Sequence, residues 1–252
     1  MRFLALIPAR YASSRFPGKP LADIHGKPMI QRVYERSTTL FGTACYVATD
    51  DTRIEDTVRT FGGQVIMTSA AHRSGTDRCA EALDTAEKIT GHPFDIVVNI
   101  QGDEPFIATE QLEQIRRCFD DPATQIATLV KPFAPDENIF NENSPKVVLS
   151  ATGDALYFSR SAIPFLRGVP RDEWQARHTY YKHIGLYAYR SDILRAVTKL
   201  PPSPLEKAES LEQLRWLENG YRIRTAVTTL ESHAIDTPED LQRILALFPS
   251  DN

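Results

Sequence analysis

Cysteine is scarce in this chain, and the spacings typical of disulfide scaffolds and zinc sites are missing. The three cysteines, Cys45, Cys79 and Cys118, are far apart, odd in number and form no C-x-x-C pair. This spacing argues against disulfides and zinc, and it predicts small buried thiols in a reducing compartment.

Long apolar runs are also absent. The N-terminal run Met1-Arg-Phe-Leu-Ala-Leu-Ile is too short for the core of a signal peptide, and Arg10 prevents the run from extending further. No segment reaches the roughly 20 apolar residues that a membrane span needs. The net charge is −4, so no bulk positive charge favours nucleic acid or a membrane surface. We therefore expect a cytoplasmic protein with no nucleic-acid or membrane partner.

Two familiar phosphate-binding motifs are missing as well. The sequence contains no G-x-x-x-x-G-K-[ST] and no G-x-G-x-x-G, which disfavours a P-loop ATPase and a nicotinamide-dependent dehydrogenase. It shows no Ser-, Cys- or Thr-centred nucleophile motif either. If the chain binds a phosphate, the simplest remaining chemistry is direct, metal-assisted phosphoryl-type transfer.

What is present is an alternation of strand-like and helix-like segments. Short apolar runs are found at 3–8, 45–49, 64–67 and 94–100, and helix patterns at 28–39, 52–61, from Ser74 onward and at 109–119. This alternation predicts an α/β fold with a doubly wound, mostly parallel sheet.

The pattern changes after about residue 145. Residues 146–150 and 155–159 flank a Thr-Gly-Asp turn and predict a β-hairpin, whereas the polar segment 165–179 predicts a mobile loop. Later segments predict a strand at 181–189, one amphipathic helix at 204–219, a strand at 222–227 and a helix at 238–247. No repeat or linker is visible. We expect one domain, 1–252, with a hairpin and loop insertion at about 145–190.

The loop Ala9–Lys19 is the first candidate site. It lies between the first strand and the first helix, at the carboxyl edge of the predicted sheet, where ligands bind. Arg10, Arg15 and Lys19 together need an anion, and a polyphosphate fits best, because arginine forks and a compact ammonium match phosphate oxygens. Composition alone leaves a solvated basic loop equally open.

Two acidic positions are candidates for a metal site. Asp103, in Gln101-Gly-Asp-Glu-Pro, follows a buried strand and should stand beside the first loop. Asp236 lies one residue outside the last helix, because Thr237 can be its N-cap with Pro238 at N1 and Asp240 completing a capping box. Carboxylates beside phosphate suit Mg²⁺. An ordinary turn and a helix cap are the plain alternatives.

Several other polar residues have both a functional and a structural interpretation. The segment Arg73-Ser-Gly-Thr-Asp-Arg can read a base edge or simply cap a helix through Ser74 and Asp77. His183 and Tyr187 share one face of a strand, where a histidine is more often structural. The remaining candidates, each of which could be a solvated surface residue, are Arg160, Glu212 and Gln213.

These residues closely resemble the 3-deoxy-manno-octulosonate cytidylyltransferase family along nearly the whole chain. The first loop and Gly-Asp-Glu-Pro are shared with other nucleotidyltransferases, whereas the later segments are more specific. The matching segments are Ile7-Pro-Ala-Arg-Tyr-Ala-Ser-Ser-Arg-Phe-Pro-Gly-Lys, Gly26-Lys-Pro-Met-Ile, Val47-Ala-Thr-Asp, Ser74-Gly-Thr-Asp-Arg, Val98-Asn-Ile-Gln-Gly-Asp-Glu-Pro, Tyr157-Phe-Ser-Arg, His183-Ile-Gly-Leu-Tyr, Pro204-Leu-Glu, Leu211-Glu-Gln-Leu-Arg and Asp236-Thr-Pro-Glu-Asp-Leu.

The resemblance implies a function and a set of roles. It implies that the protein converts CTP and 3-deoxy-D-manno-octulosonate (Kdo) to CMP-Kdo and pyrophosphate with Mg²⁺, as a step of lipopolysaccharide assembly. It also implies a nucleotide-diphospho-sugar transferase-like fold, which usually forms a homodimer through the inserted region. The implied catalytic residues are Lys19, Asp103 and Asp236, the last two as metal ligands. The implied nucleotide-binding residues are Arg10, Arg15, Lys19, Ser74 and Arg78. The implied sugar-binding residues are Gln101, Arg160, His183, Tyr187, Glu212 and Gln213.

Two other functions remain open at this point. A sialic-acid cytidylyltransferase shares the first-loop chemistry and also uses a 2-keto sugar acid. A regulator that senses CTP without turnover is the rival from another class, although binding a nucleotide does not require two protein carboxylates on one Mg²⁺.

Overall fold

The computed structural model describes residues 1–13 and 15–248, which fall into two compact units. Unit 1 consists of Met1–Glu113, Tyr189–Thr198 and Ser232–Asn252, and unit 2 of Gln114–Ala188 and Lys199–Glu231. Helix α4 (Thr109–Arg117) and strand β10 (Tyr181–Arg190) each run across a boundary between the units in the chain. The expectation of a single domain with one insertion stays a prediction.

Unit 1 is built on four parallel strands in the order β6–β1–β4–β5. Their bounds are β1 Phe3–Ala9, β4 Cys45–Thr49, β5 Val65–Met67 and β6 Ile96–Asn99. Strand β1 is central, with Leu6 in register with Tyr46 on one side and with Asn99 on the other. The four strands are largely buried, as expected of parallel strands covered by helices.

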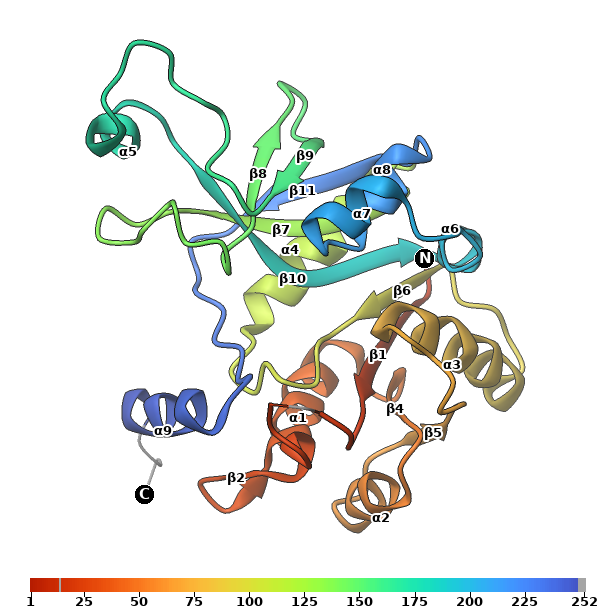
Figure 1. The fold of residues 1–252 in the computed structure, drawn as a ribbon. Coiled ribbons are helices and arrows are strands. Elements are labelled where there is room, and N and C mark those ends of the chain that lie inside the picture. Colours follow the sequence, from red (N-terminus) through yellow and green to blue (C-terminus); the bar gives the residue numbers. More distant parts are fainter. Residues whose placement is uncertain (14, 249–252) are drawn as a thin grey trace. The chain divides into compact units, whose positions relative to one another are not determined.

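Three helices connect these strands (Figure 1). They are α1 (Met29–Phe41), α2 (Thr52–Thr60) and α3 (Gly75–Thr90), and α1 and α3 both pack against β1. From β1 through β4 to β5 the chain moves across the sheet toward one edge. From β5 it crosses back over β4 and β1 to form β6 on the other side of β1. Because such crossovers are right-handed, α1 and α2 cover one face of the sheet and α3 covers the other. The predicted doubly wound parallel arrangement is confirmed in this unit.

The last helix of unit 1 begins where its sequence predicts. Helix α9 (Pro238–Leu247) has Thr237 as its N-cap, and Thr237 and Asp240 form a reciprocal capping box. Ile244 of this helix joins Ile235, Ile24 and Met29 in a small buried cluster. Four short elements of unit 1 were not predicted, namely η1 (Lys19–Leu21), β2 (Asp23–Ile24), β3 (Lys27–Pro28) and α6 (Ser191–Val197).

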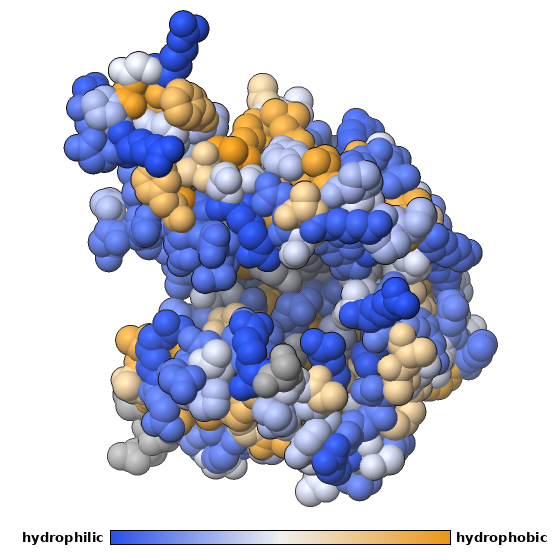
Figure 2. Space-filling model, viewed as in Figure 1, coloured by the Kyte–Doolittle hydropathy of each residue, from blue (hydrophilic) through white to orange (hydrophobic). Residues whose placement is uncertain are grey.

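Unit 2 contains parallel and antiparallel strand pairs. Strand β7 (Ile126–Pro132), which was not predicted, pairs in parallel with β11 (Ile223–Val227). Strands β8 (Lys146–Leu149) and β9 (Ala155–Ser159) form the predicted antiparallel hairpin, and β10 runs antiparallel to β8. Hydrophobic side chains gather on the surface over this hairpin (Figure 2), where Leu156 is 59% exposed.

The segment 165–179, predicted to be a mobile loop, is not without regular structure, and its mobility stays a prediction. The segment contains the short helices η3 (Arg171–Glu173) and α5 (Trp174–Arg177). Trp174 is only 3% exposed and forms a buried cluster with Ile139 and Tyr180. The polar sequence of the segment gave no sign of this cluster, in which one large indole buries its surface.

The prediction of one amphipathic helix at 204–219 is also wrong. The segment forms α7 (Pro204–Glu209) and α8 (Gln213–Glu218), with Ser210 between them in the left-handed region at φ 52°. The expected apolar stripe does not form, because Leu205 and Ala208 are exposed.

The structure also bears on the predicted buried thiols and on the search for a membrane-spanning segment. Cys45 and Cys79 are buried and Cys118 is half-buried, and all three are free thiols. Within residues 1–13 and 15–248, no helix has the length and apolar character needed to cross a membrane.

Candidate active site

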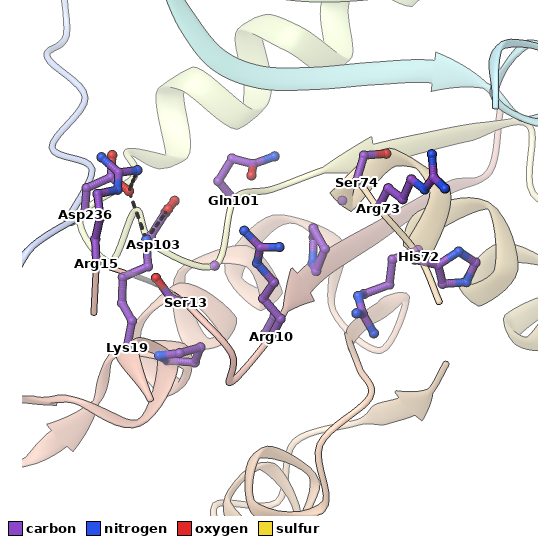
Figure 3. Close-up of a pocket in the computed structure, with 16 residues that line it drawn as sticks. Arg10, Ser13, Arg15, Lys19, His72, Arg73, Ser74, Gln101, Asp103 and Asp236 are labelled. Atoms are coloured by element: carbon purple, nitrogen blue, oxygen red, sulfur yellow. Dashed lines mark hydrogen bonds and ion pairs between the residues drawn. The ribbon is translucent and has the colours of Figure 1, made fainter. Parts of the chain in front are cut away.

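A polar pocket of about 440 Å³ lies in unit 1 at the carboxyl ends of β1 and β6 (Figure 3). Four segments line it, namely the first loop, the start of α3 with the residues just before it (72–75 and Arg78), residues 101–103 after β6, and Asp236 before α9. The volume falls in the range of small-molecule sites, and the position is where parallel sheets bind ligands.

One end of this pocket is acidic, with a cation at its centre. Lys19 Nζ lies 2.7 Å from Asp103 Oδ2 and 3.2 Å from Asp236 Oδ1. Arg15 Nη2 lies 3.1 Å from the same Asp236 oxygen (Figure 3). The backbone N–H of Ile235 donates to the Asp103 carbonyl at 3.0 Å and ties the two acidic segments together. The structure therefore brings together the first loop, the segment after β6 and the segment before α9.

The two carboxylates fit a divalent cation that also binds phosphate. Asp103 and Asp236 both contact the Lys19 ammonium group, so the two carboxylate oxygens are no further apart than the sum of their distances to Lys19 Nζ. Mg²⁺ is usually held by one or two carboxylates together with phosphate oxygens and water. Among the described residues, no group of three or more His, Cys, Asp or Glu side chains could hold a metal.

The rest of the pocket is cationic. Five cationic side chains line it against two carboxylates. Arg10 and Arg73 are exposed and have no ion-pair partner among the described residues. The N-terminus of the 16-residue helix α3 also faces the pocket at Ser74 and Gly75, which adds a positive dipole end. This surplus of positive charge suits a polyanion.

Ser74 and Arg78 form part of the pocket wall. The Ser74 hydroxyl accepts from the Asp77 N–H and caps α3. The Arg78 side chain is buried, donates to Thr68 Oγ1 at 2.5 Å and pairs with Asp50 at 3.2 Å. These contacts orient the first turn of α3, and both residues line the pocket. Ser74 lies at the end of the pocket away from Asp103 (Figure 3).

The turn after β6 requires glycine at one position. A Cβ atom at Gly102 would lie 2.9 Å from the Pro8 carbonyl oxygen, which leaves no room for any other residue. The next acidic residue, Glu104, is only 6% exposed, and burial together with the Asp103 charge raises the pKa of its carboxyl group to about 7. The close approach of the Gly102 backbone to the Pro8 carbonyl keeps Asp103 beside the first loop.

Several lining residues were not among the predicted site residues. Those with polar side chains are Ser13, His72 and Arg73. His72 bonds through Nε2 to Glu81 of α3, which also accepts from the Ser69 N–H at 2.9 Å. The available signal was position, because His72 and Arg73 immediately precede the predicted helix start at Ser74.

Of the predicted sugar-binding residues, Gln101 lines the unit 1 pocket and the others belong to unit 2. Arg160 donates to three backbone carbonyls, those of Glu209 at 2.7 Å, Glu142 at 3.0 Å and Ser210 at 3.3 Å. A guanidinium has five N–H donors, so two remain for a ligand. Arg160 also lines a unit 2 cavity of about 340 Å³ next to Phe140 and Trp174.

His183 and Tyr187 lie together in unit 2. Their ring centroids are 5.1 Å apart, which confirms that they share a strand face. His183 Nε2 lies 3.1 Å from Thr128 Oγ1, and burial lowers the pKa of the imidazole to about 4. Burial and the Glu212 charge raise the pKa of Tyr187 well above its ordinary value. Both side chains are therefore neutral hydrogen-bonding groups near neutral pH.

Glu212 and Gln213 begin helix α8. Glu212 accepts from Arg215 Nη2 at 3.1 Å, and Gln213 is only 5% exposed. The charge of Glu212 acts on Tyr187, which packs edge-to-face on Trp216 of the same helix at 5.2 Å. These contacts assemble four of the predicted sugar-binding residues in one part of unit 2.

A parallel sheet with a cation-rich loop and two acids at its carboxyl edge suits a nucleotide-binding transferase. The sequence model for the family "Cytidylyltransferase" matches residues 4–223. The chain belongs to the cytidylyltransferase family.

Full-length relatives agree with this assignment. A 3-deoxy-manno-octulosonate cytidylyltransferase of Parabacteroides distasonis is 61% identical over 252 residues, covering 98% of each chain. The enzyme of the same name from Syntrophus aciditrophicus is 49% identical and covers 96% of each chain.

Solved structures show the same fold. A CMP:2-keto-3-deoxy-manno-octonic acid synthetase complexed with CTP has a TM-score of 0.89 at 45% identity, covering 98% of each chain. A cytidylyltransferase from Leptospira borgpetersenii has a TM-score of 0.62 at 18% identity, covering 99% of this chain and 89% of its own, and shares the fold alone. The predicted fold class is confirmed.

Proposed function

We propose that this chain transfers CMP from CTP to the anomeric hydroxyl of Kdo and releases pyrophosphate. The observation that carries the proposal is the contact of Lys19 with both Asp103 and Asp236 at one end of a cation-rich pocket. The full-length relatives that bear the name of this activity support the choice of substrates.

The first loop is assigned to the triphosphate. Arg10 and Arg15 would bind phosphate oxygens, and Lys19 would neutralise the charge that grows on the departing pyrophosphate. Arg10 is exposed, and Arg15 is 64% exposed, so both can adjust to the ligand. The sugar hydroxyl attacks the α-phosphorus in line, and a new P–O bond forms as the bond to pyrophosphate breaks.

Asp103 and Asp236 are assigned to Mg²⁺. Bound there with the triphosphate, the ion would neutralise phosphate charge and lower the pKa of the attacking hydroxyl. The Lys19 ammonium that now lies between the carboxylates would shift toward the phosphates. In this assignment the three catalytic residues, Lys19, Asp103 and Asp236, would act at one end of the pocket.

Ser74 and Arg78 are assigned to the cytidine side. Their contacts with Asp77, Thr68 and Asp50 keep the start of α3 in place, so the nucleoside would meet a rigid wall. Gln101 lies between this wall and the acidic end in Figure 3, with its amide donating to Asn99 Oδ1 at 3.1 Å.

The predicted sugar-binding residues of unit 2 are assigned to Kdo, and Gln101 of the unit 1 pocket remains a separate prediction. Arg160 keeps two N–H donors for the Kdo carboxylate, and the neutral His183 and Tyr187 can meet hydroxyl groups. Glu212 and Gln213 complete the assignment. No positive charge on His183 takes part near neutral pH, so selection among acids falls to Arg160.

The proposal extends to the setting of the enzyme. We infer a role in lipopolysaccharide biosynthesis in the cytoplasm, and a homodimer. Support for the dimer comes from exposed apolar side chains of unit 2, among them Leu156 at 59% and Phe165 at 69% exposure. Light scattering of the wild type and of Leu156→Glu tests it, since a charge on a buried dimer surface should shift the mass to that of one chain.

A pyrophosphate-release assay with CTP and a panel of keto-sugar acids tests the activity. Kdo should give turnover with CTP, and sialic acid, which needs room for an N-acyl group and a longer tail, should give far lower kcat/KM. Equal kcat/KM for the two acids would refute the substrate assignment. CTP binding without pyrophosphate release would support a sensor instead. An Asp103→Asn preparation controls for a contaminating enzyme.

A further inference from the structure

A cation–π contact joins the first loop to helix α2 in unit 1. The guanidinium carbon of Arg53 lies 3.3 Å from the ring centroid of Tyr11. Asp51 holds the same guanidinium in a fork, with Nε to Oδ1 at 2.9 Å and Nη2 to Oδ2 at 2.6 Å. Asp51 is itself the N-cap of α2, so the cation over Tyr11 is anchored to a helix end.

The same tyrosine ring also packs against the backbone just before Lys19. Gly18 donates its N–H to the Tyr11 carbonyl at 3.0 Å, and a Cβ atom at Gly18 would lie 3.1 Å from the ring. Gly18 has φ 72°, a left-handed value that favours glycine, and it caps the short helix η1 (Lys19–Leu21). Tyr11 therefore closes the loop on itself, between Arg10 at its start and Lys19 at its end.

Neither Tyr11 nor Arg53 lines the pocket, although the neighbours of Tyr11 in the loop do. The lining includes Arg10 and Ser13 on either side of Tyr11, and Lys19 directly after Gly18. An effect of Tyr11 or Arg53 on the ligand must therefore pass through the conformation of the loop. This separates the pair from the phosphate-binding residues themselves.

We propose that Tyr11 and Arg53 are positioning residues, which hold the first loop in the conformation that presents Arg10 and Lys19 to the triphosphate. The inference rests on the proposed function, because it assigns the loop to CTP. A loop that is closed only part of the time binds CTP with an apparent affinity lowered by that fraction. Bound CTP then restores the closed loop, so turnover at saturation is preserved.

The matched pair Arg53→Ala and Arg59→Ala tests the role of the cation. Both arginines are exposed residues of α2 paired with a carboxylate, Asp51 and Glu55 respectively, but only Arg53 stacks on Tyr11. Arg53→Ala should raise the KM for CTP roughly three- to tenfold and change kcat less than about twofold. Arg59→Ala should change neither. Equal KM values in the two variants would overturn the proposal, and so would a loss confined to kcat.

The ring is tested with Tyr11→Phe and Tyr11→Leu. Phenylalanine keeps the face under Arg53 and the contact with Gly18, so it should retain the wild-type KM for CTP. Leucine removes the aromatic face and should behave as Arg53→Ala does. A Tyr11→Phe variant as impaired as Tyr11→Leu would contradict a role for the ring face.

Hydrogen exchange supplies a readout that does not depend on turnover. In the protein without nucleotide, Arg53→Ala and Tyr11→Leu should speed exchange in peptides covering the first loop, whereas Arg59→Ala should not. Unchanged exchange in the loop would refute the positioning role even for an active enzyme. If the wild type shows no CMP transfer, the proposed function fails, and loop exchange still decides whether Tyr11 and Arg53 hold the loop.

Discussion

Lys19 Nζ lies 2.7 Å from Oδ2 of Asp103, although 84 positions separate the two residues in the sequence. The same ammonium reaches Asp236, 217 positions away, at 3.2 Å. A lysine with two carboxylates in a half-buried site needs no further anion. When a triphosphate enters, its charge competes for the lysine, and the two carboxylates become available to a divalent cation.

The two carboxylates should be required for turnover. Asp103→Asn and Asp236→Asn should fold normally and lose nearly all CMP transfer, because an amide binds Mg²⁺ far more weakly than a carboxylate does. Steady-state pyrophosphate release with a magnesium titration measures the effect. Asp84→Asn is the control, since Asp84 pairs with Arg195 at 2.8 Å on the surface. Turnover within about tenfold of wild type, or roughly 1.4 kcal/mol of barrier, would contradict the metal assignment.

Lys19 should matter more to the transition state than to CTP binding. Charge grows on pyrophosphate as it departs, so Lys19→Met should lower the single-turnover rate more than it weakens CTP affinity. Quenched-flow rates and CTP titrations give the two quantities. Lys27→Met is a matched control, because Lys27 is exposed and pairs with Glu35. A collapse of affinity with an unchanged chemical rate would reduce Lys19 to a docking residue.

Arg160 should affect Kdo use without affecting CTP binding. Lysine keeps the charge but cannot bridge the carbonyls of Glu142, Glu209 and Ser210. Both Arg160→Lys and Arg160→Ala should therefore raise the KM for Kdo, the alanine variant more strongly. Arg167→Ala, at an exposed position, is the control. Damage limited to CTP affinity would leave the reaction in place and disprove this location for the sugar carboxylate.

His183 should make the fold less stable in acid. Burial lowers its pKa from 6.5 to about 4, so between these values the unfolded chain takes up a proton that the folded chain does not. Stability from this residue is present above pH 6.5 and is lost as the pH falls toward 4. His183→Gln should weaken the fall in melting temperature between pH 7 and pH 4.5. The same fall in both proteins would contradict the lowered pKa of His183.

Local interactions explain the elements that were predicted well. Helix α9 has the predicted bounds, because the capping contacts between Thr237 and Asp240 lie within three residues of each other. Strands β1 and β4 follow from apolar runs that only a covered parallel sheet accommodates. In these segments the neighbouring residues alone specify the conformation.

Contacts between distant residues explain the errors. The apolar pattern of 204–219 continues through Ser210, but the chain bends there, and Arg160 binds the carbonyls of Glu209 and Ser210 at the break. In the segment 165–179, Trp174 packs on Ile139 and Tyr180. Strand β7 exists through its pairing with β11, almost a hundred positions later. No local pattern contains these partners.

The candidate site shows the same division. The sequence alone predicted a phosphate-binding role for Arg10, Arg15 and Lys19 and a metal-binding role for Asp103 and Asp236, because residue type and helix capping are local properties. Only the tertiary structure decided that Lys19 contacts both acids, that His183 is half-buried and neutral, and that Tyr11 lies under Arg53. These relationships depend on which surfaces pack together, and packing joins residues that the chain keeps far apart.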